Sequence, residues 1–196
     1  MIQLSIPGPH LRVAALYVQA DGVYATMPDV DPWPQERDAR TYPGELPVVA
    51  HPPCATWGRY HQKAGGLGND GGCFEAALAS TRRWGGVIEH PANSQAWDRY
   101  ELPKPMEGMD EHGGWTLAVF QSWWGHTAIK PTWLYIVGTE RACIYPGPIG
   151  GGKKPLETVN RPLEHLSKRN RAASPVAFAR WLVELAASSR VEARNR

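Results

Sequence analysis

The sequence has few cysteines and no long apolar run. Three cysteines stand at positions 54, 73 and 143 among 196 residues, and their wide spacing gives neither a disulfide framework nor a Cys-x-x-Cys metal motif. This predicts a reducing compartment. No apolar stretch approaches the ~18 residues that cross a bilayer, and residues 1–10 lack a basic flank, a long apolar core and a small-residue cleavage site. We therefore expect a soluble, cytoplasmic protein with no membrane partner.

The overall charge is also small. A formal net charge of +2 decides nothing about partners by itself. The distribution is uneven, however, because six basic and only two acidic residues lie between Lys153 and Arg171. Residues 145–172 are otherwise rich in glycine and proline and show little hydrophobic periodicity, which predicts a basic loop or arm.

Short apolar runs alternate with a helical pattern, which predicts an α/β fold. Residues 11–18 and 48–50 have the composition of buried strands, and residues 73–84 have apolar positions at helical spacing. Residues 86–89 then form a second strand of a strand–helix–strand unit. Because such crossovers are right-handed and short, we expect strands 48–50 and 86–89 to lie parallel and close together.

Two later segments predict an antiparallel addition to these strands. Residues 115–124 and 130–138 are rich in aromatic and β-branched residues and are separated by a short link, as in a hairpin. Residues 26–47 are rich in proline and acid, and only a helical turn near 36–40 is expected there.

The chain is expected to close with a helix. Ser174 and Pro175 have the residue types of an N-cap and a first helical position, and they begin a predicted helix over 175–188. We therefore expect residues 1–188 to form a single domain and 189–196 a disordered tail. The predicted fold is Rossmann-like, a mostly parallel sheet with an antiparallel strand pair, flanked by helices.

Two of the predicted strands are stopped by proline beside a chemically useful side chain. Cys54 follows Pro52 and Pro53, and neither proline can supply the N–H that a central strand needs. Glu89 stands just before Pro91, at the end of the next strand. Because ligands of open α/β sheets bind at the carboxyl ends of the strands, we expect a thiol and a carboxylate to face one crevice.

The order of these motifs resembles the catalytic half of the DNA (cytosine-5) methyltransferases, especially their compact phage-type members. The matching features are a Pro-Pro-Cys loop ending at Cys54, a Glu-His-Pro turn beginning at Glu89, and a Gln-x-Trp-x-Gly-x4-Lys-Pro-Thr run over 121–132. In that family the cysteine attacks C6 of a flipped cytosine and the glutamate holds N3 and N4 of the ring. The resemblance therefore implies that Cys54 is the nucleophile and that Glu89 holds the base.

The resemblance also implies S-adenosylmethionine as cofactor and DNA as partner. The family's Phe-x-Gly-x-Gly loop, which cradles this cofactor, is replaced by YVQADGVYA over 17–25, where Asp21 and Gly22 are expected to form a related turn. Glu36 or Asp31 would stand at the place of the ribose-binding acid. The cofactor-binding residues expected are Asp21, Gly22, Glu36 and Pro52. The DNA-binding residues expected are Arg59, then Gln121, His126 and Lys130 in place of the family's paired arginines, and Lys168, Arg169 and Arg171 of the basic segment.

Cations near Cys54 are expected to lower the pKa of its thiol, and Arg59 and His51 are the candidates. His51 and His90 stand at two strand ends and suggest a metal site with Cys54 and Glu89. No second short-spaced pair completes such a site, so no metal is predicted.

Structural roles compete with each of these assignments. Cys54 could instead serve as a small buried apolar residue. Glu89 could instead form an ion pair with Arg82 or Arg83. Two other functions are consistent with the pattern. One is a pyrimidine-nucleotide C5-modifying enzyme with thymidylate-synthase-like chemistry, and the other is a catalytically inactive DNA-binding or decoy protein.

Overall fold

A six-stranded mixed sheet carries the fold in the computed structural model, which describes residues 12–141 and 173–190. The strands lie in the order β2-β1-β3-β4-β6-β5; the first four are parallel, and β6 is antiparallel to both of its neighbours. The prediction of an α/β fold with a mostly parallel sheet and an antiparallel addition is confirmed. The strands are β1 (Val13–Leu16), β2 (Val30–Trp33), β3 (Val48–Ala50), β4 (Gly86–Pro91), β5 (Trp115–Phe120) and β6 (Pro131–Val137).

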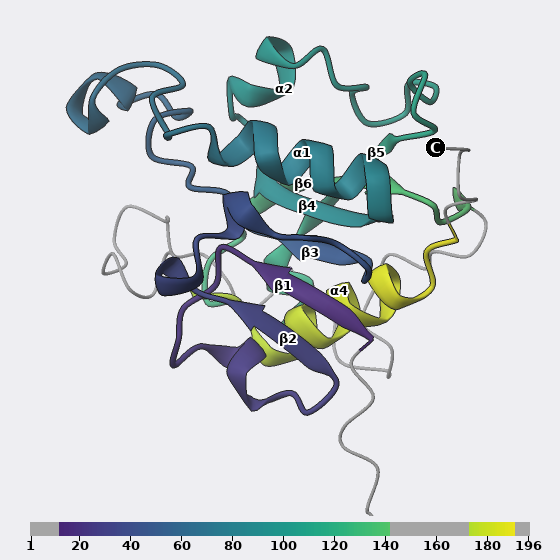
Figure 1. The fold of residues 1–196 in the computed structure, drawn as a ribbon. Helices are drawn as coiled ribbons and strands as arrows, with labels where there is room; N and C mark the ends of the chain where they lie inside the picture. The colour runs from purple at the N-terminus through teal and green to yellow at the C-terminus, as the bar shows by residue number, and fades with distance from the viewer. Residues whose placement is uncertain (1–11, 142–172, 191–196) are drawn as a thin grey trace, which may run out of the picture.

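Helices cover both faces of this sheet. Figure 1 shows α1 and α4 on opposite faces, and the buried residues accordingly form two apolar clusters, one on each side. The α-helices described are α1 (Cys73–Trp84), α2 (Ala96–Arg99) and α4 (Val176–Ala187). Short 3-10 turns join the strands, namely η1 (Val23–Thr26), η2 (Gln35–Arg37), η3 (Ala39–Thr41), η4 (His61–Ala64) and η5 (Gln121–Trp124).

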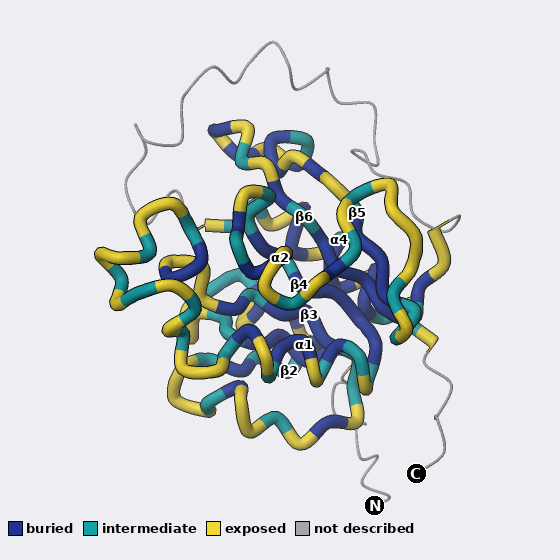
Figure 2. Tube along the Cα trace, turned by 90° about the horizontal axis from the view of Figure 1, so that it is seen from above, coloured by how far each residue is buried: buried dark blue, intermediate teal, exposed yellow. Residues whose placement is uncertain are grey.

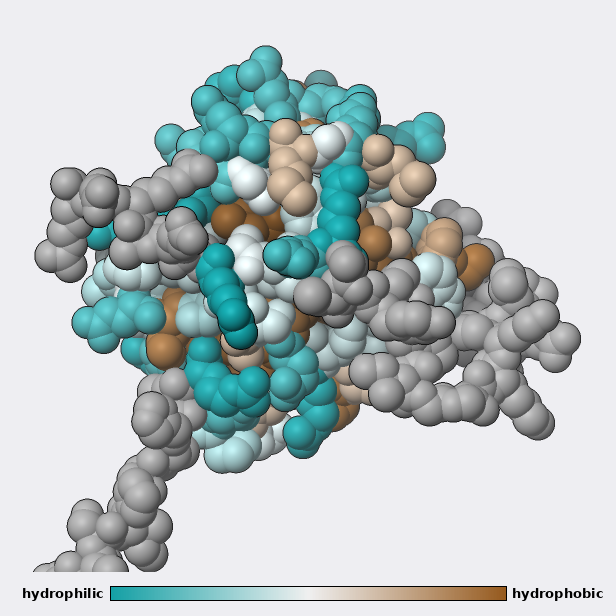
Figure 3. All heavy atoms as spheres, turned by 90° about the vertical axis from the view of Figure 1, so that its right-hand side faces the viewer, coloured by the Kyte–Doolittle hydropathy of each residue, from teal (hydrophilic) through white to brown (hydrophobic). Residues whose placement is uncertain are grey.

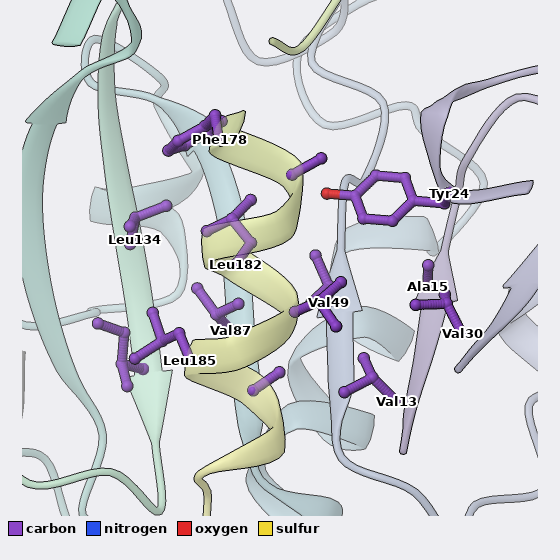
Figure 4. Packing of buried hydrophobic residues seen from close by; sticks show 14 of the residues in the cluster. Val13, Ala15, Tyr24, Val30, Val49, Val87, Leu134, Phe178, Leu182 and Leu185 are labelled. Carbon is purple, nitrogen blue, oxygen red and sulfur yellow. The ribbon is translucent and has the colours of Figure 1, made fainter. Parts of the chain in front are cut away.

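The first face is covered by α4, the predicted closing helix. Phe178 and Leu182 are fully buried, and Figure 4 shows them with Leu185 against Val87 and Leu134 of the sheet. Full burial of each such side chain is worth roughly 1.5–3 kcal/mol. The helix begins one residue later than its sequence suggests, because Pro175 itself is the N-cap and no side chain caps the helix.

The second face is covered by α1, whose bounds are those predicted. Phe74, Ala77 and Leu78 are buried as the spacing indicates. The predicted apolar pattern ends at Trp84, which is only half-buried. Thr81 is buried on this face, and its hydroxyl is satisfied by donating to the carbonyl oxygen of Ala77 (2.8 Å).

A strand that the sequence did not predict lies at one edge of the sheet. β2 contains Asp31 and Pro32, which argue against a central strand. An edge strand tolerates proline, since one of its sides makes no ladder hydrogen bonds, and β2 pairs with β1 alone. Val30 and Trp33 are buried at its two ends and anchor it to the core.

The predicted antiparallel pair is confirmed, with two differences. Strand β5 ends at Phe120, and the four residues that follow form the 3-10 turn η5 instead of continuing the strand. Strand β6 also pairs with β4, so it is inserted into the sheet between β4 and β5. This insertion brings the beginning of β6 to the carboxyl end of β4.

The loop over 55–72 projects from the carboxyl edge of the parallel strands, at the left of Figure 1. Figure 2 shows this loop largely exposed, whereas the strands at the centre are buried. Figure 3 shows the opposite side of the molecule, where the coloured residues are mainly hydrophilic and the apolar ones form small separate patches. No helix within 12–141 and 173–190 is long and apolar enough to cross a membrane. The predicted arm 145–172 lies outside the described residues, as does most of the predicted tail, 191–196.

Candidate functional site

The candidate site lies where β3 and β4 end. The register pairs Ala50 with Ile88, which brings the next residues, His51 and Glu89, level with each other. Beyond them the chain turns at the two prolines, and Cys54 emerges as an exposed residue with a free thiol. The strand of Glu89 is longer than predicted: Pro91 does not stop it, because β4 continues to Pro91 against β6. Glu89 is nevertheless the first residue after the part of β4 that pairs with β3, and Cys54 follows the end of β3.

Glu89 is held by a donor on each carboxylate oxygen. His51 Nδ1 lies 2.9 Å from Oε2, and Gln121 Nε2 donates to Oε1 at 2.9 Å. Burial by itself would raise the pKa of this carboxyl, but the hydrogen bond and charge of His51, with Lys130 and His90, bring the pKa of Glu89 down to about 2. Glu89 is thus an ionised, oriented acceptor at neutral pH.

His51 is in turn held from its other side. Its Nε2 lies 2.7 Å from the hydroxyl of Tyr24, whose side chain is almost wholly buried. The backbone N–H of His51 donates to the carbonyl oxygen of Leu16 (3.1 Å), which fixes the start of the Cys54 loop on β1. Sequence reasoning considered His51 as a cation beside Cys54 and as a metal ligand, and it did not consider Tyr24 or a contact between His51 and Glu89.

The electrostatics of Cys54 differ from the expectation. Desolvation of the thiol, followed by the charge of Glu89, raises the pKa of Cys54, and Lys130 opposes this shift. The prediction that nearby cations lower this pKa is therefore wrong for the free protein. The cation that acts on the thiol is Lys130, since neither Arg59 nor His51 is among the groups that shift this pKa.

Lys130 is itself positioned beside the site. Its Nζ donates to the carbonyl oxygen of Ala173, just before α4 (3.2 Å). Burial lowers the pKa of Lys130, whereas the charges of Glu89 and Cys54 raise it. The predicted DNA contact is thus a half-buried cation that neighbours both functional side chains.

His90 lies on the other face of the sheet from Glu89, because successive residues of a strand point to opposite faces. Its ring is 1% exposed and packs against Phe74 of α1 and Trp97 of α2. Burial lowers the pKa of His90 to about 4, which keeps the imidazole neutral. Within 12–141 and 173–190 no group of three or more His, Cys, Asp or Glu side chains is placed to hold a metal ion.

The residues expected to bind a cofactor all follow the carboxyl ends of β1, β2 or β3, but they do not form a glycine-lined cradle. Asp21 and Glu36 are exposed, Gly22 is half-buried and Pro52 is buried. Asp31, the alternative acid, is occupied by Arg37 (2.5 Å) and by Nε1 of Trp33 (2.7 Å).

Besides Lys130, the described candidates for DNA contact fall into two groups. Arg59 is exposed on the loop 55–72. Gln121 and His126 are buried, and the Nδ1 of His126 lies 2.9 Å from the carbonyl oxygen of Ala128. Gln121 instead belongs to the site through Glu89, while Lys168, Arg169 and Arg171 lie outside the described residues.

Comparisons with protein-family models, with curated proteins and with solved structures give no match. A function is therefore inferred from the residues of this chain alone.

Proposed function

We propose that this protein modifies a pyrimidine base in DNA through covalent addition of Cys54. The observation that carries the proposal is the placement of an exposed cysteine and a doubly held, ionised glutamate just beyond the paired part of the parallel strands β3 and β4, with Lys130 acting on both. This is the arrangement that the resemblance to the DNA (cytosine-5) methyltransferases implies for Cys54 and Glu89.

The chemistry requires an electron-poor ring and a deprotonated thiol. The thiol of Cys54 loses its proton to solvent, its Sγ forms a bond to C6, and the electron pair of the C5–C6 double bond moves into the ring. Lys130 and water would offset this developing charge, while the ionised Glu89 accepts a hydrogen bond from an N–H of the ring edge, N4–H of cytosine or N3–H of uracil. Water then donates a proton to C5, and the reverse steps expel the thiolate. The net result without a second substrate is exchange of the C5 hydrogen with solvent.

Methyl transfer would require S-adenosylmethionine, which supplies the methyl group that replaces the C5 hydrogen. The strand order reverses between β1 and β3. Doubly wound Rossmann-like sheets show the same reversal and bind their ligands beside it, so we propose that this sheet is Rossmann-like. The residues after β1 do not fit the family's cofactor loop, however, since Tyr17 stands there at φ 61° with its ring in the apolar cluster beside α1. No step is assigned to this cofactor.

A DNA partner is supported by the loop beside Cys54. Arg59, Tyr60 and Lys63 are exposed, and both cations lie within 6 Å of the tyrosine ring centre, at 5.8 and 5.6 Å. No acidic residue occurs between 55 and 69. Cations and an exposed ring on one loop are suited to phosphates and to an unstacked base.

We also propose that the basic segment between Lys153 and Arg171, which lies outside the residues that the structure describes, contacts DNA phosphates. Replacing Lys168, Arg169 and Arg171 by alanine should reduce the slope of log affinity against log salt concentration by about two to three, because each phosphate contact contributes about 0.9 to that slope. Arg180→Ala, which removes an exposed cation of α4, should leave the slope unchanged. A wild-type slope in the triple variant would move the DNA surface to the loop 55–72.

Exchange of the C5 hydrogen tests the addition step directly. Duplex DNA with tritium at C5 of cytosine or of uracil is incubated with the protein, and tritium release is compared with that of Cys54→Ala and of Cys73→Ala, a free cysteine outside the site. Release that needs Cys54 but not Cys73 supports the proposal. Absence of release with both bases, under conditions where DNA binds, would contradict it.

A second incubation distinguishes the related functions. DNA carrying 5-fluorocytosine or 5-fluorouracil should give a mass-detectable adduct at Cys54 with S-adenosylmethionine if methyl transfer follows addition. Exchange without an adduct would show addition alone, and activity on free nucleotides but not on DNA would favour thymidylate-synthase-like chemistry. The position of Tyr17 after β1 favours one further candidate, a DNA-binding protein without catalysis, which predicts DNA binding with neither signal.

A further inference from the structure

A continuous chain of hydrogen bonds runs through the site and includes the Glu89 carboxylate. It runs from the hydroxyl of Tyr24 to Nε2 of His51 (2.7 Å), from Nδ1 of His51 to Glu89 (2.9 Å), and from Glu89 to Gln121 (2.9 Å). Gln121 Nε2 also donates to Oγ1 of Thr132 at the start of β6 (3.1 Å). His51 and Gln121 contact the carboxylate directly, and through them it is linked to Tyr24 of η1 and to Thr132 of β6.

The direction of each bond follows from the chemistry of its partners. An ionised carboxylate has no proton to donate, so Nδ1 of His51 must carry the hydrogen of the bond to Glu89. In the neutral ring Nε2 is then an acceptor, and the hydroxyl of Tyr24 donates to it. Burial raises the pKa of Tyr24 well above its ordinary value, which keeps this hydroxyl protonated.

The arrangement leaves Glu89 in one orientation. Each carboxylate oxygen receives one donor from the protein, so rotation about the last side-chain bond would break two hydrogen bonds. The remaining lone pairs face outward from those donors. His51 also lies three residues before Cys54 on the same turn, so one residue ties the loop of the thiol to the carboxylate.

We propose that His51 is a positioning residue that fixes Glu89 as an oriented acceptor, and that Glu89 and Tyr24 together hold His51 in the tautomer with its proton on Nδ1. The tautomer is independent of any reaction. The kinetic consequence rests on the proposed function, because it concerns how Glu89 meets the base.

The tautomer is measured without any variant, in ¹⁵N spectra of histidine-labelled protein at a pH where the ring of His51 is neutral. We expect the hydrogen on Nδ1 in the wild type. In Glu89→Gln the side-chain amide can donate to Nδ1, so the hydrogen should move to Nε2, which then donates to Tyr24. In Tyr24→Phe the hydrogen should stay on Nδ1. A wild-type ring with its hydrogen on Nε2 would overturn the proposal.

The positioning role is tested by His51→Ala and His51→Asn. The asparagine amide nitrogen occupies the place of Nδ1, so it keeps the donor to Glu89 while losing the contact with Tyr24. In the exchange assay His51→Ala should lower the rate about a hundredfold, as for loss of an oriented polar group in an active site. His51→Asn should recover at least about tenfold, and the control His112→Ala should stay within about twofold of wild type.

A structural role makes a different prediction. Carbon-13 titration of the Glu89 carboxyl should show its pKa raised in His51→Ala and closer to the wild-type value in His51→Asn, at matched melting temperatures. An unchanged titration in folded His51→Ala, or an asparagine variant as slow as the alanine variant, would contradict positioning. If the Nδ1 tautomer is found but wild-type exchange is absent, the proposed function fails and the hydrogen-bond assignment stands.

Discussion

The charge of Glu89 should stabilise the fold, and Glu89→Gln isolates this effect. The pKa of this carboxyl falls from 4.5 to about 2 in the folded protein. Each pKa unit corresponds to about 1.4 kcal/mol, so this fall contributes at most about 3.5 kcal/mol to the free energy of unfolding. Glutamine recovers part of this loss if His51 changes tautomer, and we expect a cost of about 2 kcal/mol at pH 7.

The sign of the pH dependence is fixed by the direction of the shift. A carboxyl whose pKa is depressed by folding adds stability above its unfolded pKa, and this stability is lost as pH falls toward the folded value. The difference between wild type and Glu89→Gln should therefore be constant above about pH 5.5 and shrink between about pH 4.5 and 2.

Urea unfolding followed by tryptophan fluorescence measures this difference at pH 7, 5, 4 and 3. The exposed carboxylate Glu36 provides the control, since Glu36→Gln should change the unfolding free energy by less than about 0.5 kcal/mol. A difference for Glu89→Gln that stays constant to pH 3, or grows as the pH falls, would refute the reasoning. In the exchange assay the same variant should lose about a hundredfold in rate with its DNA affinity unchanged.

Two further substitutions test the electrostatics and the scaffold. Lys130→Met removes the cation that opposes the raised pKa of Cys54. The pH at which iodoacetamide labelling of Cys54 is half-maximal, measured by mass spectrometry, should therefore move upward. An unchanged midpoint would argue against an interaction between Lys130 and the thiol. Asp110→Asn replaces a carboxylate that accepts hydrogen bonds from Tyr135 (2.6 Å), from the guanidinium of Arg82 and from backbone N–H groups. The change should lower the free energy of unfolding, measured in urea, by about 2–4 kcal/mol. The control is Asp98→Asn, because the Asp98 side chain is 74% exposed in its ion pair with Lys104, and this change should cost under about 1 kcal/mol. Equal costs for the two variants would contradict the assignment.

The central part of the fold was predictable because its signals are local. The helix over 73–84 has apolar positions at helical spacing, and the strands on either side are short apolar runs bounded by glycine or proline. A short crossover of fixed hand then leaves one arrangement for β3 and β4. The proximity of Cys54 and Glu89 follows from that arrangement.

The rest depends on long-range contacts that no short pattern reveals. Pro32 hides β2 from a sequence pattern, because this strand is held by its pairing with β1 and by the burial of Val30 and Trp33. Tyr24 stands 27 positions from its partner His51, and Gln121 stands 32 from Glu89. The raised pKa of Cys54 depends on packing around the thiol, which the residue types nearby do not show.

Glu89 has opposite effects on two stages of the proposed reaction: it opposes deprotonation of the Cys54 thiol, and it holds the base that the thiolate attacks. Its charge raises the pKa of Cys54 in the free protein, which protects the thiol. A base that forms a hydrogen bond with the carboxylate would weaken this effect just as the electrophile arrives. Glu89→Gln should therefore increase the rate of iodoacetamide labelling of free Cys54 at pH 7 while it decreases exchange of the C5 hydrogen. A decrease in both rates would show that Glu89 does not restrain the thiol, and an increase in both would show that it does not hold the base.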